Sequence, residues 1–362
     1  MTSPAPVNGS SEISSLAGTE PRCSPDIGVV VIGRNEGERL RRCLESVVRA
    51  AASVIYVDSG SSDGSVTLAR SYGVEVVELD LSTPFCAARA RNEGCARLLS
   101  SNPPLKFIQF IDGDCEIIGE WLHIAADALQ NNARIAIVAG FLHERFPERS
   151  IYNRLGNLEW NFANPGEVES VGGIFMVRKE AFEDAGGFDA SVPAGEEPEL
   201  CSRLRKIGWQ IQRLANDMAW HDLAMSRFSQ WWTRMIRYGY GSSDVGLRFN
   251  LPNFNRNNLR TRIWSCWLAV TLASPALVAL APLNNRASDV KWLIFLFICL
   301  WPAQLARISL RTWQKGTKPS LAIAYGFFIM LSYFPQMIGQ GLYWIDRLKK
   351  RSFRLVEYKT TR

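Results

Sequence analysis

Residues 106–118 have the sequence KFIQFIDGDCEII, and this stretch decides which fold the chain can adopt. A short apolar run of the buried-strand type ends at Asp112-Gly113-Asp114. In an open α/β sheet, ligands bind at the carboxyl ends of the strands, and two adjacent carboxylates need a compensating charge. Mg²⁺ or Mn²⁺ would supply that charge, because these ions prefer oxygen ligands. The alternative is a plain acidic turn, since Asp and Gly are ordinary turn residues.

The composition fits a globular protein that contacts a membrane. The chain has 362 residues, enough for one or two domains with a full core, and its hydrophobic share of 47% is ordinary. Three long apolar runs lie near its end, and much of the net charge of +6 lies beside them. This pattern favours a membrane partner over a nucleic acid, for which the sequence has no zinc-finger spacing or aromatic RNP pattern.

The eight cysteines include no C-x-x-C pair, so neither a disulfide framework nor a zinc site is expected. We expect reduced, mostly packed thiols and a cytosolic catalytic region. Cys115 follows the second carboxylate of the acidic triplet, and we expect it to be a small core residue.

Strand and helix patterns alternate between residue 27 and the acidic triplet. Residues 1–25 are rich in Ser, Pro, Ala and Gly, so we expect a disordered arm there. The next segments favour strands at residues 29–32, 54–57 and 74–79, separated by segments with helical spacing of apolar residues. Such alternation is typical of βαβ units, so a parallel sheet is the expected core.

Several motifs follow one another in a fixed order. They are Asn35-Glu36, VDSGSSDG at residues 57–64, ARNEG at residues 90–94, DGD at residues 112–114, GGFD at residues 186–189 and GEEPEL at residues 195–200. In this order they resemble the catalytic domain of a family 2 glycosyltransferase, over residues 26–225. The resemblance implies the α/β fold called GT-A, which is Rossmann-like with a mostly parallel sheet. It also implies a hexosyltransferase with a UDP- or GDP-sugar donor, Mg²⁺ or Mn²⁺ as cofactor, and inversion of the anomeric centre.

The residues expected to bind the donor lie at the ends of neighbouring strands. They are Asn35, Glu36, Asp58, Arg91 and Asp112. The resemblance gives Asp58 a contact with the nucleotide base, although a turn cap explains it nearly as well. Arg91 would pair with the diphosphate, since guanidinium binds phosphate oxygens bidentately, and its alternative is a solvated helix face.

The acidic stretch at residues 195–200 departs from the family pattern. The usual Asp is replaced by Glu197, which has a similar pKa and one more methylene, so we expect it to be the general base. Glu196 is the alternative base. Both glutamates also suit the first turn of a helix that contains Pro198, so a purely structural role stays open.

His221 is expected to complete the metal site with Asp112 and Asp114. In many enzymes with this fold, a late histidine or aspartate supplies the last metal or diphosphate contact. His221 is one of three histidines and follows an apolar stretch, so a structural role is the alternative.

Residues 226–262 favour an amphipathic interfacial segment. RFSQWWTRMIRYGY at residues 227–240 mixes aromatic rings with arginines, which is typical of the headgroup level of a membrane. The same segment would also serve to cover the acceptor site. Processive synthases have Q-x-x-R-W here, whereas Gln230 is followed by a different spacing, and this argues against processive synthesis.

Residues 263–345 are predicted to enter the membrane. The apolar runs at residues 263–283 and 290–310 are long enough to span it, and residues 321–345 form a third run interrupted by Pro335. Basic residues precede the first run, link the second to the third, and fill the tail at residues 346–362, so all three segments should be cytoplasmic. A re-entrant pair of half-helices meeting at Pro335 satisfies this rule, and three full spans are the alternative.

The sequence therefore predicts a multi-pass glycosyltransferase of an inner or plasma membrane with a cytoplasmic catalytic domain followed by C-terminal membrane helices. Its acceptor would be lipid-linked or a membrane-held saccharide, as in synthesis of a cell-surface polysaccharide or glycolipid. A polyprenyl-phosphate sugar synthase is the alternative within the same class. An alternative of another class is a non-catalytic subunit that binds nucleotide sugars within a membrane assembly.

Overall fold

The computed structural model describes residues 24–101, 104–280 and 287–350, except for the side chains of residues 101, 268 and 271–299. Most of the predicted disordered arm, at residues 1–25, lies outside this range, but its last two residues begin the first strand. Residues 351–362 of the predicted tail also lie outside it.

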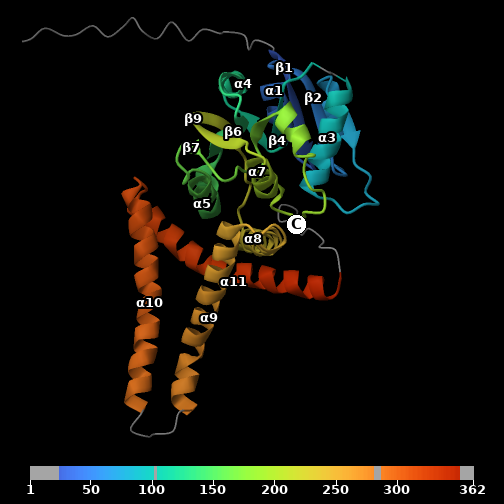
Figure 1. Ribbon diagram of the computed structural model, residues 1–362. Helices are drawn as coiled ribbons and strands as arrows, with labels where there is room; N and C mark the ends of the chain where they lie inside the picture. The colour runs from blue at the N-terminus through green and yellow to red at the C-terminus, as the bar shows by residue number, and fades with distance from the viewer. Residues whose placement is uncertain (1–23, 102–103, 281–286, 351–362) are drawn as a thin grey trace, which may run out of the picture.

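The first half of the catalytic domain is built from parallel βαβ units, as predicted (Figure 1). Its elements are β1 (Ser24–Gly33), α1 (Glu38–Val47), β2 (Ala51–Asp58), α2 (Ser65–Ser71), β3 (Glu75–Glu78), α3 (Ala87–Ser101) and β4 (Phe107–Asp112). The strands pair in the order β3-β2-β1-β4, all parallel. The carboxyl ends of β1, β2 and β4 therefore meet at one edge, where nucleotides bind in such sheets.

The second half of the same sheet is mixed, which corrects the prediction of a mostly parallel sheet. Its elements are β5 (Cys115–Ile117), α4 (Trp121–Asn131), β6 (Ile135–Glu144), the 3₁₀ helix η1 (Pro147–Arg149), α5 (Ile151–Trp160), β7 (Gly166–Glu167), β8 (Phe175–Arg178), α6 (Lys179–Asp184), α7 (Glu196–Lys206) and β9 (Gln210–His221). Strand β8 runs antiparallel to both β4 and β6. Because Phe175 pairs with Phe110 near the end of β4, the loop before β8 lies at the same edge as the acidic triplet.

Helix α3 packs closely on the sheet because the helix and the sheet each place a glycine at their contact. A Cβ on Gly94 of α3 would lie 2.5 Å from Val30 Cγ1, and one on Gly28 of β1 would lie 2.6 Å from Leu98 Cδ2. Neither position has room for a side chain. The glycine of the ARNEG motif therefore fixes α3 against β1, which holds Arg91, on the same helix, at the edge of the sheet.

Four helices follow the catalytic domain. They are α8 (Phe228–Arg248), α9 (Pro252–Leu280), α10 (Ala287–Gln314) and α11 (Pro319–Leu348). In Figure 1, α9 and α10 form an antiparallel pair that projects away from the domain, whereas α11 runs across them, beside α8 and beneath the domain. The predicted interfacial segment at residues 226–262 therefore divides between α8 and the first turns of α9.

The predicted break at Pro335 is wrong, because α11 is one continuous helix through that residue. Side chains of α9 support the region around the proline. The Ser265 hydroxyl donates to the Tyr333 carbonyl at 2.7 Å, and the Thr261 hydroxyl lies 3.0 Å from Gln336 Oε1. Among the described residues, α11 is the one helix whose length and apolar composition would allow it to cross a membrane.

Helices α8 and α11 cross at two glycines. A Cβ on Gly239 would lie 2.1 Å from the carbonyl oxygen of Gln336, and one on Gly339 would lie 2.1 Å from that of Ile236. At this crossing the two backbones are in contact, so even a methyl group must push the helices apart.

We predict that Gly239→Ala destabilises the protein by about 1–3 kcal/mol, the usual cost of overpacking. The measurement is the midpoint of thermal unfolding of the full chain in detergent micelles. Gly341→Ala on α11 is the control, since a Cβ there meets nothing within 4 Å. An unchanged midpoint for Gly239→Ala would contradict the close crossing.

Candidate active site

A cavity of about 430 Å³ opens at the carboxyl ends of β1 and β4. Helix α7 begins at its wall, β9 ends there, and α8 contributes one side chain. Its charged lining comprises Arg34, Glu36, Arg39, Arg91, Asp112, Asp114, Glu196, Glu197, His221 and Arg237. The structure thus brings most of the predicted site residues into one cavity of the size that small-molecule ligands occupy.

Arg91 holds three of the predicted carboxylates together. Its Nη1 lies 2.7 Å from Glu196 Oε1 and 3.2 Å from Glu197 Oε1, and its Nη2 lies 3.1 Å from Asp112 Oδ1. The side chain is 2% exposed. Both terminal nitrogens of Arg91 are directed at carboxylates, which suits a role in positioning them, and the diphosphate contact stays a prediction.

The loop before β8 closes over this cluster through a glycine. A Cβ on Gly173 would lie 2.6 Å from Arg91 Nη2, 3.1 Å from Asp112 Oδ2 and 3.2 Å from Glu197 Oε1. The carbonyl oxygen of Gly173 also accepts a hydrogen bond from Arg91 at 3.4 Å. Any larger residue at this position would displace the charged groups. No sequence motif quoted above marks Gly173, because only the antiparallel entry of β8 brings it here.

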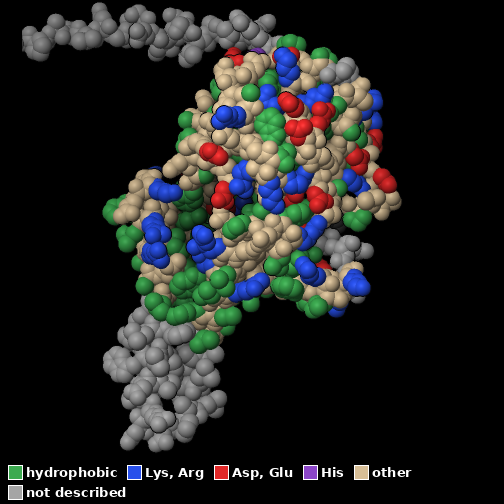
Figure 2. Space-filling model, viewed as in Figure 1, with side chains coloured by type: hydrophobic (Ala, Val, Ile, Leu, Met, Phe, Trp, Pro, Cys, Tyr) green, Lys and Arg blue, Asp and Glu red, His purple; other side chains and the backbone are tan. Residues whose placement is uncertain are grey.

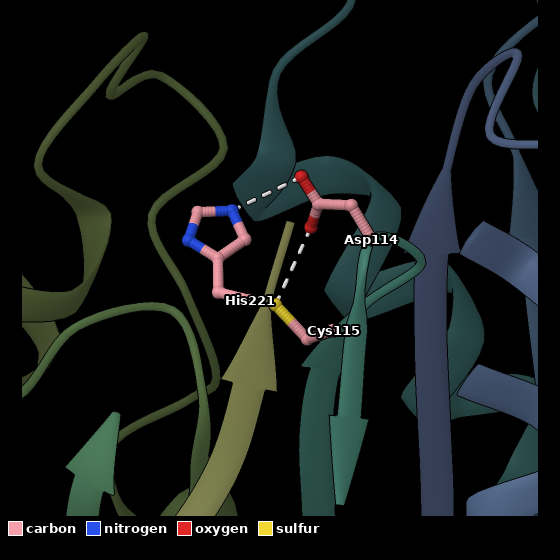
Figure 3. Close-up of side chains that lie close together, drawn as sticks. All are labelled: Asp114, Cys115 and His221. Atoms are coloured by element: carbon pink, nitrogen blue, oxygen red, sulfur yellow. Dashed lines mark hydrogen bonds and ion pairs between the residues drawn. The ribbon is translucent and has the colours of Figure 1, made fainter. Parts of the chain in front are cut away.

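Asp114 and His221 come together because β5 pairs with β9. Cys115 pairs with His221 across these antiparallel strands, which places His221 Nε2 3.1 Å from Asp114 Oδ2 (Figure 3). Asp114 is buried, while the Asp112 side chain is 39% exposed toward the cavity. The two aspartates therefore differ in environment although one residue separates them.

The Cys115 thiol also contacts this pair. Its sulfur lies 3.3 Å from Asp114 Oδ1, so the thiol donates to the carboxylate (Figure 3). The ligand atoms of Asp114, Cys115 and His221 all lie within 4.8 Å of one another. Hard cations prefer oxygen to sulfur, so this contact suits Cys115 as a group that orients Asp114. The prediction of a merely packed cysteine missed this hydrogen bond.

The donor set fits a hard divalent cation. Asp112 and Asp114 offer carboxylate oxygens, and His221 offers an imidazole nitrogen. Among the described atoms, the buried His221 Nδ1 has no hydrogen-bond partner. The ring nitrogen that faces Asp114 is the other one, Nε2. Together with the carboxylate oxygens of Asp114 and Asp112, Nε2 has the chemistry of an Mg²⁺ or Mn²⁺ site with mixed oxygen and nitrogen ligands.

Glu197 and Glu196 occupy the first turn of α7, facing the cavity. Burial raises the pKa of Glu197, and the neighbouring charge of Glu196 raises it further, while Arg91 opposes both effects. Glu199, in the same turn, is directed away, because its two oxygens accept from Arg203 at 2.6 and 2.7 Å. Glu196 and Glu197 therefore suit both alternatives, the first turn of a helix and the position of a general base.

Asp58 and Asn35 shape the loops of the site. Asp58 is 2% exposed and accepts hydrogen bonds from Tyr56 Oη at 2.9 Å and from the Ser61 backbone at 2.7 Å. These contacts are those of the turn-cap alternative, and the contact with a nucleotide base stays a prediction. Asn35 has a φ of 54° and accepts from the Ser62 backbone at 2.7 Å, which ties the loop after β1 to the loop after β2.

Three arginines of the lining were not predicted. Arg34 and Arg39 flank Glu36, with an ion pair of 2.8 Å between Arg39 and Glu36. Arg237 comes from α8, which the sequence places far from the acidic motifs. Their guanidinium groups suit a diphosphate, since bidentate pairing with phosphate is typical of arginine. Arg34 could have been predicted from the sequence, because it precedes Asn35-Glu36. Arg237 could not, because only the packing of α8 brings it to the cavity.

Comparison with known proteins identifies the class to which this fold and site belong. The model of "Glycosyl transferase family 2" matches residues 28–186, and that of "Glycosyl transferase family group 2" matches residues 148–310. The chain is a member of the family 2 glycosyltransferases.

Curated relatives agree with this assignment. Glycosyltransferase AglE of Haloferax volcanii is 22% identical over 234 residues, covering 61% of this chain and 74% of AglE. Succinoglycan biosynthesis protein ExoA of Rhizobium meliloti is 29% identical over 203 residues, covering 51% of this chain and 59% of ExoA. The pre-mycofactocin glycosyltransferase of Mycobacterium tuberculosis is 26% identical over 235 residues, and the match spans about half of its length (48%).

A solved structure supports the fold. The mannosyltransferase PcManGT from Pyrobaculum calidifontis, in complex with GDP-Man and Mn²⁺, superposes with a TM-score of 0.55 at 16% identity. The superposition covers 91% of this chain and 89% of that one. The fold is thus that of a GT-A glycosyltransferase, as predicted from the sequence motifs.

We predict that Arg91→Met destabilises the protein by roughly 3–5 kcal/mol, because removing one partner leaves buried carboxylates without their counter-charge. Thermal unfolding of the full chain in detergent checks this. The control is Arg97→Met on the same helix, whose ion pair with Glu75 is at the surface and contributes at most about 1 kcal/mol. Equal losses for the two variants would contradict the positioning role of Arg91.

Proposed function

We propose that this glycosyltransferase moves a sugar from a UDP- or GDP-sugar to an acceptor at a membrane surface, with Mg²⁺ or Mn²⁺ and with inversion. The observation that carries the proposal is the single cavity in which Asp112, Asp114 and His221 face Glu197 and meet Arg237 of α8. Such a cavity combines a cation site, a base and a helix that leads toward the apolar C-terminal part.

The diphosphate of the donor has two sets of residues that suit it. Asp112, Asp114 and His221 would hold the cation, which when bound neutralises the charge that develops on the departing nucleoside diphosphate. Arg34 and Arg237 would contact the diphosphate oxygens directly. The Mn²⁺ and GDP-Man of the mannosyltransferase complex agree with this assignment.

Glu197 would take the proton from the acceptor hydroxyl. The oxygen then forms a bond to the anomeric carbon while the bond from that carbon to the diphosphate oxygen breaks, and one such displacement inverts the centre. A carboxylate with a raised pKa is a stronger base, which suits this step near neutral pH. Arg91 keeps Glu197 and Asp112 at a fixed separation on opposite sides of its guanidinium.

The proposal is tested first through the metal. Asp114→Ala should weaken nucleotide-sugar binding only when Mn²⁺ is present, because the loss is that of a cation ligand. Isothermal titration of UDP- and GDP-sugars, with and without Mn²⁺, measures it. Asp217→Ala, at a surface carboxylate paired with His143, serves as control. Equal affinities of Asp114→Ala and wild type in Mn²⁺ would exclude the metal assignment.

The base is tested by pH dependence. Glu197→Gln should keep donor binding and lower turnover by roughly 10²-fold or more, the usual scale for a general base. Glu196→Gln should move the acid limb of turnover to lower pH. Its charge raises the pKa of Glu197, so without it Glu197 loses its proton at lower pH. A limb that stays in place would contradict Glu197 as the base, and near-wild-type turnover of Glu197→Gln would favour a phosphate acceptor.

For the membrane, we propose that α9 and α10 cross the bilayer. Helix α11 is itself long and apolar enough to cross, but we propose that it lies with α8 at the cytoplasmic surface. Side chains exposed on α11 form an apolar stripe at helical spacing, comprising Ile323, Phe327, Ile338, Leu342 and Ile345. Figure 2 shows hydrophobic side chains gathered at the base of the catalytic domain, where α8 and α11 lie, with Lys and Arg around them. A helix with such a stripe binds in the plane of the interface.

This arrangement satisfies the positive-inside rule without a re-entrant segment. The basic groups before the first predicted span, in the link between α10 and α11 and at the end of α11 all face the cytoplasm if α11 does not cross. They are Arg256, Arg260, Arg262, Arg307, Arg311, Lys315, Lys318, Arg347, Lys349 and Lys350.

The orientation of α11 gives a topology prediction. Single cysteines at Ser320 and Lys349, near the two ends of α11, should both resist an impermeant thiol reagent in intact cells whose protein lacks native cysteines. Both should react after the cells are opened, which is the control for accessibility. Labelling of exactly one end in intact cells would mean that α11 crosses the bilayer.

A further inference from the structure

A second cavity, of about 440 Å³, adjoins the catalytic one. It lies between the loop that precedes α3, the loop that precedes α7, and helices α8 and α11. Phe85 and Pro193 line both cavities, so the two share a wall. A ligand in the second cavity would therefore lie next to the site of transfer and against the two helices proposed to contact the membrane.

The second cavity contains a cation, Arg347, that has no carboxylate at ion-pair distance among the described residues, although Asp244 of the same lining lies close enough to act on it electrostatically. Arg347 of α11 donates to Tyr343 Oη at 2.8 Å and lies 5.8 Å from the ring centre of Trp344. Arg248, on the opposite wall, is neutralised by Asp244 at 3.1 Å and Asp189 at 3.7 Å. Arg347 is thus less compensated than Arg248, because Asp244 is ion-paired with Arg248 instead, and Tyr343 holds the Arg347 guanidinium in place.

The rest of the lining suits an amphipathic molecule. Tyr240 and Tyr343 meet edge to face, with ring centres 5.6 Å apart, and Phe85 adds a third aromatic ring. Beside the cavity, the end of α11 exposes two large apolar side chains, Trp344 at 41% and Leu348 at 82% exposure, next to basic residues. An anionic group at Arg347 would have an apolar surface next to it, along which a hydrocarbon chain would lie.

We propose that the second cavity binds the phosphate group of a membrane lipid through Arg347. Arginine pairs with phosphate by charge-assisted hydrogen bonds, and aromatic side chains are typical of the headgroup level. Two sources share this chemistry, namely a prenyl phosphate that serves as acceptor or acceptor carrier and a bulk anionic phospholipid. The inference rests on the proposed function only in linking lipid binding to sugar transfer.

The binding test uses the full chain in a neutral detergent, with farnesyl monophosphate as probe and thermal stabilisation as readout. Wild type should bind this probe, whereas farnesol and inorganic phosphate should bind much more weakly, because each lacks half of the recognised structure. Arg347→Gln should weaken binding about 10- to 100-fold, the scale of a charged hydrogen bond. Arg347→Lys should restore part of it.

Lys349→Gln is the matched control, because it removes a charge from an exposed residue of the same helix end that does not line the cavity. It should bind as wild type does. Equal affinity of wild type and Arg347→Gln would overturn the proposal, and so would equal binding of farnesol or of inorganic phosphate.

Competition identifies the source of the lipid phosphate. If dioleoylphosphatidylglycerol displaces farnesyl monophosphate at similar concentration, the cavity recognises bulk phospholipid. If it does not, the cavity selects the prenyl phosphate. Mn²⁺-dependent nucleotide-sugar binding is measured on the same preparations. Its absence from wild type would defeat the proposed function and leave the lipid result standing, whereas its retention in Arg347→Gln shows that the variant keeps its catalytic cavity.

Discussion

The buried guanidinium of Arg91 is the interaction on which the site depends. Burying the Arg91 cation alone would cost its hydration free energy, and three acidic side chains so close together would repel one another. The ion pairs offset both costs, because Asp112, Glu196 and Glu197 surround the arginine within ordinary ion-pair distances. The cluster joins the end of β4 to the start of α7 and to the middle of α3. The carboxylates that would meet the donor and acceptor are therefore held in place by one buried side chain.

The absence of side chains at a few positions makes this arrangement possible. Gly94 brings α3 against the sheet, and Gly173 leaves room for Arg91 beside its carboxylates. In the helical part, Gly239 and Gly339 let α8 and α11 come into backbone contact. Because α8 also contributes Arg237 to the catalytic cavity, this second contact connects the helices proposed to lie at the membrane with the proposed donor site. Changes at the membrane surface would thus reach the cavity through one packed helix pair.

The two adjoining cavities suggest how a glycosyltransferase of this kind would separate its substrates. The catalytic cavity has acidic groups that suit a cation and arginines that suit a diphosphate, whereas the second has Arg347, without a carboxylate at ion-pair distance, among aromatic rings. A soluble, multiply charged donor and an amphipathic lipid would therefore enter from different directions. The shared wall at Phe85 and Pro193 is where they would approach each other.

The sequence by itself determined the parallel half of the sheet, the family and most of the site, because apolar periodicity and motif order are local properties. The predicted site residues Asp114, His221, Glu196 and Glu197 all line the catalytic cavity, and their roles stay proposals. Only the tertiary structure decided that β8 enters antiparallel with Gly173 and that Arg91 faces carboxylates. It also decided that α11 is continuous through Pro335. These features depend on contacts between segments far apart in the chain, where neighbouring atoms set the burial, the charge and the direction of each side chain.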